Sequence, residues 1–137
     1  MLVQFQSRLA KAYGAVGQVD KGIELLKKVI SEQGERSAYW ADVQFTLGEL
    51  LMQSGTGSSE AERWIRQAIE NARRQELKSW ELRATLSLAR LLRKQGRADE
   101  ARKMLAEIYG WFTEGFDTAD LKDAKALLEE LNSEARG

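Results

Sequence analysis

Hydrophobic residues recur every three or four positions along almost the whole chain. In the first segment, Leu2, Phe5, Leu9 and Tyr13 follow these steps, and this spacing places them on one face of a helix. Similar stripes return in six later segments, separated by stretches rich in Gly, Ser or aromatic residues. No segment alternates with a period of two, the pattern of a half-buried strand. The pattern therefore predicts about seven helices and an all-α fold.

Short polar residues mark several of the expected helix starts. Asp20 is placed to cap the second helix, and Ser58 or Ser59 to cap the fourth. Thr118 or Asp120 is placed to begin the last helix. Side chains of this kind accept hydrogen bonds from the free N–H groups of a first helical turn.

The aromatic residues fall into two groups. Three tryptophans lie on apolar helix faces and are expected to pack in the core or between repeats: Trp40, Trp64 and Trp80. The stretch 110–116 is expected to be a packed turn that clamps the last helix over the final repeat, through Trp111, Phe112 and Phe116. A partner-binding aromatic patch in this turn is the alternative.

Three helix pairs superimpose on one another, at spacings of 38 and 41 residues. Three shared positions carry the match: a leucine in the first helix, a glycine eight residues later, and a small residue in the second helix. They are occupied by Leu9, Leu47 and Leu88, then Gly17, Gly55 and Gly96, then Gly22, Ala61 and Ala101. The small residue allows close helix approach, and the glycine suits a left-handed turn.

A helix pair of this kind cannot bury its apolar face alone, so neighbouring pairs must stack. We therefore expect one domain over residues 1–137, built as a right-handed solenoid of helical hairpins. The repeats are expected at about 2–34, 37–75 and 78–108, followed by a capping turn and helix at 109–133.

The second unit resembles the tetratricopeptide repeat (TPR) family. The matching positions are Leu47, Gly48, Leu51, Gly55, Ala61, Ile65 and Ala68, with one extra residue in the loop. The other units depart at Ala89, where the family often has Gly, and at Gly22, where Ala is usual; the chain has no Pro to end a unit. The resemblance implies a non-catalytic protein-binding module whose groove is lined by the first helix of each pair.

A narrower resemblance covers roughly residues 36–131. The runs 76–91 and 108–128 are similar to the C-terminal repeats of large bacterial regulators, which carry a nucleotide-cyclase-like or winged-helix domain and a predicted ATPase. This implies that the chain is the repeat portion of a larger signalling protein, or a stand-alone relative. It holds no cyclase or ATPase residues.

Composition argues against catalysis and metal binding. The chain has no Cys and no His, so it lacks zinc–thiolate chemistry and the commonest general base and transition-metal ligand. Neighbouring carboxylates such as Glu129 and Glu130 point about 100° apart on a helix and do not converge. The loop 55–59 precedes a helix but lacks the Lys and the strand of a phosphate-binding loop. We expect no enzyme activity, no metal and no cofactor.

Charge and hydropathy bound the partners. Lys and Arg number 21, as do Asp and Glu, so the formal net charge is zero, which disfavours nucleic-acid binding. No stretch reaches the length of about 18 apolar residues that a membrane span needs. The N-terminal sequence has no signal-peptide pattern, so we expect a cytoplasmic protein.

The expected groove carries the candidate binding residues. The first helices contribute Ser7, Arg8 and Lys11; then Asp42, Phe45, Glu49, Met52 and Gln53; then Arg83, Leu86, Ser87, Arg90, Arg93 and Lys94. Arg83, Arg90 and Arg93 share one helical face and could bind carboxylate or phosphate groups bidentately. A merely solvated charged face is the alternative for these arginines.

Several functions fit this pattern. The leading one is a scaffold that binds a peptide, a protein or a sister domain of the same chain. The alternative is a regulatory segment that senses a small anionic metabolite and controls an attached cyclase or ATPase. A homodimer is also plausible, because Leu2, Val3 and Phe5 begin the chain without a polar cap.

Overall fold

The computed structural model describes residues 2–33, 40–55, 58–113 and 118–136, and the side chains of 8–32, 43–55, 58–113 and 118–134. These residues form helices and turns and contain no strand, which confirms the all-α prediction. The helices are α1 (Leu2–Ala15), α2 (Val19–Gln33), α3 (Trp40–Ser54), α4 (Ser58–Arg74), α5 (Lys78–Lys94), α6 (Ala98–Trp111) and α7 (Ala119–Arg136).

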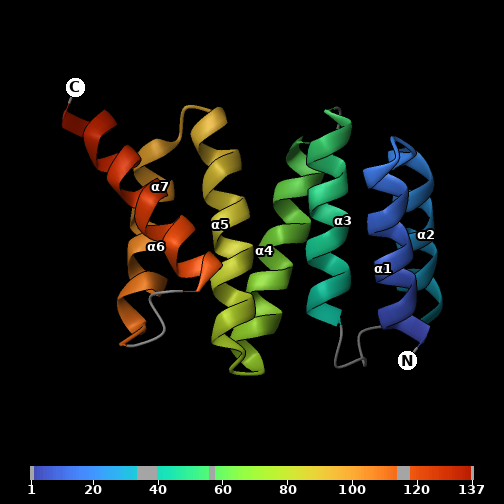
Figure 1. Cartoon of the computed structure of the whole chain (residues 1–137). Helices are drawn as coiled ribbons and strands as arrows, with labels where there is room; N and C mark the ends of the chain where they lie inside the picture. The colour runs from blue at the N-terminus through green and yellow to red at the C-terminus, as the bar shows by residue number, and fades with distance from the viewer. Residues whose placement is uncertain (1, 34–39, 56–57, 114–117, 137) are drawn as a thin grey trace.

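The helices form a row of antiparallel hairpins, as the repeat pattern predicts (Figure 1). Helix α1 packs on α2, α3 on α4, and α5 on α6. The first helices also touch one another, α1 against α3 and α3 against α5. Helix α7 contacts α5 and α6, so it takes the place of the next first helix. One face of the row is therefore lined by α1, α3, α5 and α7.

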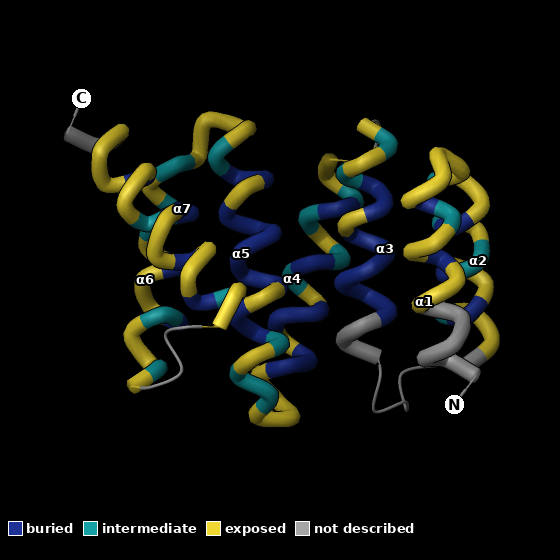
Figure 2. Tube along the Cα trace, viewed as in Figure 1, coloured by how far each residue is buried: buried dark blue, intermediate teal, exposed yellow. Residues whose placement is uncertain are grey.

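The shared leucine position lies at the centre of the hairpin stack. Leu47 and Leu88 are fully buried, as are the small residues Ala61 and Ala101. Figure 2 shows this buried strip running through the facing sides of α3, α4 and α5. Leu9 holds the same position in α1 but is 37% exposed. Helix α1 contacts α2 and α3, whereas α3 and α5 each also contact a preceding hairpin.

Small residues set how closely the helices of a hairpin approach. A Cβ added to Gly48 would lie 2.4 Å from Ile65 Cγ1, a fully buried side chain of α4. A Cβ at Gly22 would lie 2.8 Å from the carbonyl oxygen of Ala10. Such distances are well inside van der Waals contact, so a larger residue would force the helices apart.

The turns inside the hairpins depend on left-handed glycines. Gly17, Gly55 and Gly96 have φ angles of +84°, +77° and +77°. No atom lies within 4 Å of a Cβ built at any of them, so backbone conformation and not space selects glycine. The turn between α4 and α5 places Glu76 in the same region, at φ 58°.

The turn inside a hairpin, at Gly96, and the turn between hairpins, at Glu76, share one hydrogen-bond pattern. The Arg97 N–H donates to the Leu92 carbonyl at 2.8 Å, spanning five residues. The Leu77 N–H donates to the Ala72 carbonyl, also at 2.8 Å. This is the Schellman termination, which places its left-handed residue directly after the C-cap residue of the helix. Glu76 therefore stands where glycine would be less strained.

Three local predictions need correction. Helix α2 begins at Val19, so Asp20 lies inside its first turn and does not cap it. Gly110 and Trp111 belong to α6 and not to a turn, because the helix continues to Trp111. The Trp111 side chain is 56% exposed, so it does not clamp the last helix into the core. Its neighbour Phe112 does pack partly buried against the core.

Other local predictions fare differently. The Leu121 N–H donates to Thr118 Oγ1 at 3.4 Å, which confirms Thr118 at the start of α7. Trp64 and Trp80 are partly buried against the two core clusters, as predicted. The side chain of Trp40 and all of Phe116 lie outside the described residues.

Two opposite effects on stability follow from the turns. Gly96→Ala is expected to lower the free energy of unfolding by about 1 kcal/mol, because alanine is strained at this φ. Glu76→Gly is expected to raise it by roughly 0.5 kcal/mol, because it relieves the same strain at the cost of chain entropy. Urea unfolding followed by circular dichroism measures both changes.

Gly110→Ala is the control for these variants. Gly110 lies in α6 with open space around its Cβ position and no left-handed φ, so alanine should be neutral or slightly stabilising there. Equal losses in Gly96→Ala and Gly110→Ala would contradict the turn argument.

Candidate binding groove

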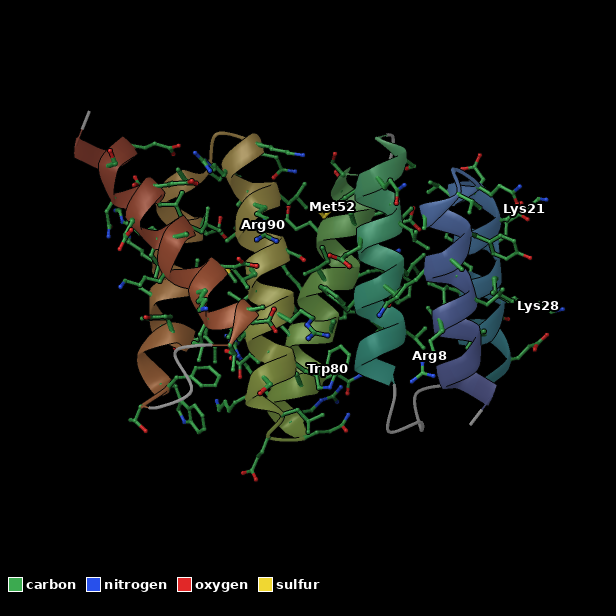
Figure 3. All side chains as sticks on the ribbon, viewed as in Figure 1. Arg8, Lys21, Lys28, Met52, Trp80 and Arg90 are labelled. Atoms are coloured by element: carbon green, nitrogen blue, oxygen red, sulfur yellow. The ribbon has the colours of Figure 1, made fainter. Side chains whose placement is uncertain are left out.

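A groove of about 530 Å³ opens between α3, α5 and α7, on the face lined by the first helices. Its lining residues are Met52 from α3; Arg90, Arg93 and Lys94 from α5; and Asp123, Ala126, Leu127 and Glu130 from α7. We call it the Met52 groove. In Figure 3, Arg90 lies on the front of α5, and Met52 lies between α5 and α3. Its volume falls in the range of ligand-sized sites.

The structure brings together only part of the predicted binding set. Met52, Arg90 and Arg93 line the groove. Arg83 lies apart, in a second hollow of about 470 Å³ that also includes Phe112. Lys11 is exposed on α1 and does not line the groove. The predicted arginine face is therefore divided between two hollows.

Glu49 and Phe45 on α3 also depart from the predicted groove lining. Glu49 is exposed but does not line the groove, and its carboxylate accepts a hydrogen bond of 3.0 Å from Ser87 Oγ. Phe45 is only 3% exposed and packs in the core cluster with Leu82 and Leu86. The groove assignment of Phe45 is wrong, because this side of α3 is covered by the next hairpin.

Further members of the predicted set are also buried or undescribed. Leu86 and Ser87 are 2% and 4% exposed and do not line the groove. The side chains of Ser7 and Asp42 lie outside the described residues. Arg8 is exposed on α1, well away from the Met52 groove (Figure 3).

Helix α7 supplies carboxylates to all three predicted arginines. Arg83 Nε lies 3.3 Å from Asp120 Oδ2. Arg93 Nη1 lies 2.8 Å from Glu130 Oε2, and its Nε donates to Glu134 Oε1 at 2.9 Å. Arg90 Nη2 reaches Asp123 Oδ2 at only 3.8 Å. We call this set the α5–α7 ion pairs.

The sequence contains a signal for these partners in the spacing of the carboxylates, which the pattern of the arginines does not reveal. Asp120, Asp123, Glu130 and Glu134 recur in steps of three, seven and four residues, which places them on one face of α7. Because α5 and α7 are alternate helices of the row, they run parallel, and two complementary faces can pair along their length.

The geometry strengthens the charged form of Arg93 in particular. Hydrogen bonds to Glu134 and then to Glu130 raise the pKa of Arg93 above its ordinary value. The side chain remains 37% exposed, so solvent screens this attraction. The pair therefore orients α7 more than it stabilises the fold.

A second ion network ties α4 to α6 on the opposite face. Arg66 contacts Glu62 at 2.9 Å and Glu100 at 2.7 Å. Arg97 contacts the same two carboxylates, at 2.9 Å and 2.7 Å. Each charge therefore has two partners of opposite sign from different elements.

This network lowers the pKa values of its carboxyl groups. Burial of Glu62 favours its neutral form, but hydrogen bonds from Arg66 and Arg97 outweigh that effect and lower its pKa below 4.5. Hydrogen bonds from Arg66 and then Arg97 lower the pKa of Glu100 in the same way. Both groups are therefore ionised over the whole neutral range.

The described side chains that line the groove offer binding chemistry. No group of three carboxylates among them is close enough to hold a metal ion. The groove instead combines apolar side chains with guanidinium, ammonium and carboxylate groups. Within the described ranges, no helix is long and apolar enough to cross a bilayer.

Comparison with known proteins adds a structural likeness only. No family model and no curated protein matches the chain. The solved structures that resemble it include the crystal structure of the nearly identical TPR-like repeats of a candidate kinesin light chain from Podosopora anserina, and that of a point variant of them. The sequence identities are 17% and 16%, and the TM-scores are 0.48 and 0.47. Each alignment covers 98% of this chain and 88% of the other. A likeness at this level shows neither a shared family nor a shared function.

The α5–α7 ion pairs predict unequal effects on α7. Arg93→Gln should speed amide hydrogen exchange in α7 by up to about fivefold, since an exposed ion pair contributes little to stability. Arg90→Gln should leave exchange in α7 nearly unchanged, because its contact is longer. Equal acceleration in both variants would show that the two arginines hold α7 alike.

The α4–α6 network predicts a specific dependence of stability on pH. Lowered carboxyl pKa values contribute stability that is complete above about pH 4.5 and disappears as the pH falls through the folded-state values. Glu62→Gln should therefore lower the melting temperature at pH 7, and the difference from the unmodified chain should shrink toward pH 3.

Glu24→Gln provides the control for the pH experiment. Glu24 is exposed on α2 and makes no ion pair with any residue in the described part of the chain. Its variant should follow the unmodified melting curve at every pH. A Glu62→Gln deficit that persists at pH 3 would mean that packing, and not charge, causes the loss.

Proposed function

We propose that this chain is a non-catalytic interaction module that binds a protein or peptide partner in the Met52 groove. The observation that carries the proposal is the position of the groove, on the face where three parallel helices come together. Its floor includes Met52 and Leu127, and charged side chains stand around it. This combination of an apolar centre and a polar rim is typical of protein interfaces.

The tetratricopeptide resemblance of the sequence supports the same function. Its conserved pattern concerns helix packing, and its expected binding surface is the face of the first helices. A sister domain of a longer chain could occupy the groove just as a separate protein could. The narrower resemblance to bacterial cyclase-like or ATPase regulators favours this arrangement, although the comparisons with known proteins lend it no support.

A protein partner fits the groove better than a small anionic metabolite. The metabolite alternative depends on a face of three unpaired arginines, whereas α7 pairs Arg83 and Arg93 with carboxylates at 3.3 Å and 2.8 Å.

The edge expected to support a homodimer involves Leu2, Val3 and Phe5, whose side chains lie outside the described residues.

Blocking the groove tests the proposal. Binders to the full chain would first be selected from a displayed library of random twelve-residue peptides. Ala126→Trp places a large ring in the groove from an exposed position on α7, so it should weaken the selected binders at least about tenfold by fluorescence anisotropy.

Lys125→Trp is the matched control. It adds the same ring to the neighbouring exposed position of α7, which does not line the groove. Circular dichroism checks that both variants fold. Failure to enrich any peptide, or equal binding to the two variants, would refute the groove as the binding site.

A further inference from the structure

The α5–α7 ion pairs follow a register that leaves one arginine without a matching carboxylate. Arg83 and Asp120 are 37 residues apart, as are Arg93 and Glu130. The same offset applied to Arg90 leads to Leu127, which has no charge to offer. Arg90 therefore reaches toward Asp123, one helical turn earlier, and its shortest contact is 3.8 Å.

The Arg90–Asp123 contact is weak by its geometry. A distance of 3.8 Å exceeds that of a good charge-assisted hydrogen bond, which is about 2.7–2.9 Å. The two side chains are 51% and 57% exposed, so water competes for both charges. Exposed ion pairs of this quality contribute little to stability. Arg90 is thus the α5 arginine most available to an incoming carboxylate.

Lys94 adds a second available cation beside Arg90. It follows Arg90 by four residues on α5, which places the two side chains on the same helical face. Lys94 is exposed and lines the groove. It forms no ion pair with any carboxylate in the described ranges. Arg93, by contrast, is already held by Glu130 and Glu134.

An apolar surface lies next to these two cations. Met52 is partly buried and packs against both core clusters, so its side chain is held in place. Leu127 is buried on α7 with only 5% exposure, and Ala126 beside it is exposed. The floor can therefore accept one aliphatic side chain without burying any of the groove's charges.

We propose that the Met52 groove recognises a peptide segment in which an aliphatic residue is flanked by acidic residues. The aliphatic side chain packs on Met52 and Leu127, and the carboxylates pair with Arg90 and Lys94. Asp123 pairs with Arg90 in the free protein and is displaced by the ligand carboxylate. Asp123 therefore competes with the ligand for Arg90. This assignment rests on the proposed function and names the partner's chemistry.

Synthetic peptides test the proposal directly. The probe is a fluorescein-labelled ten-residue peptide with a central Leu, two Glu on each side and Gly–Ser ends. Matched probes replace the four Glu by Gln, or the Leu by Ala. In fluorescence anisotropy at 50 mM salt, we expect the Glu–Leu peptide to bind at least about fivefold more tightly than either matched probe. Its affinity should fall as salt is raised.

Variants of the protein separate the individual contacts. Arg90→Gln and Lys94→Gln should each weaken the Glu–Leu peptide by about threefold to fivefold, the loss of one partly exposed ion pair. Asp123→Asn should instead tighten binding by about twofold to fivefold, because it frees Arg90 and removes a repelling charge. A merely structural role for Asp123 would not strengthen binding.

Lys28→Gln is the matched control for the loss of a positive charge. Lys28 lies on α2, far from the groove (Figure 3). The Lys28→Gln variant should therefore bind the peptide like the unmodified chain. Equal affinity for the Glu and Gln peptides, equal losses in Lys28→Gln and Arg90→Gln, or weaker binding by Asp123→Asn would overturn the proposal.

Failure of this proposal can be distinguished from failure of the proposed function. If library-selected peptides still lose binding in Ala126→Trp but show no preference for acidic residues, the groove binds partners and its assigned chemistry is wrong. If Ala126→Trp affects neither the selected peptides nor the Glu–Leu peptide, the groove is not the binding site.

Discussion

The close approach of the two helices in each hairpin is the constraint on which the rest of the structure depends. At Gly48 the contact with Ile65 is so close that even a Cβ would lie 2.4 Å from a buried side-chain atom. Ala61 and Ala101, at equivalent positions in the second helices, are completely buried. This tight pairing leaves the larger apolar residues to fill the space between hairpins. Stacking of the hairpins therefore follows from hairpin geometry, because a single hairpin cannot bury its apolar residues alone.

Stacking in turn determines the relation between first helices. Alternate helices of an antiparallel row run parallel, so α5 and α7 face each other in a constant register. Arg83 and Arg93 of α5 pair with Asp120 and Glu130 of α7 at an offset of 37 residues, and Leu127 stands where the same offset would place a partner for Arg90. That leucine gives the groove an apolar floor and leaves Arg90 weakly paired. A packing rule thus produces a surface with both hydrophobic and charged character.

The repeat pattern in the sequence was sufficient to predict most of the fold. Leu47 and Leu88 could be assigned to the core because the same residue type recurs at the same place in each hairpin. Leu9 shows the limit of this reasoning, since the same position in α1, which contacts α2 and α3, is 37% exposed. Trp111 shows another limit: aromatic residues near Gly110 indicated a turn, yet the helix continues through both.

The sequence by itself determined the helices, the hairpins, the glycine turns and the absence of His and Cys chemistry, because these depend on local spacing and residue type. It also placed Arg83, Arg90 and Arg93 on one helical face. Only the tertiary structure decided their partners, because pairing across 33 to 41 residues depends on how α7 lies against α5, and helical periodicity does not specify that register. For the same reason, it alone decided that Phe45 is buried and that Arg83 lies outside the Met52 groove.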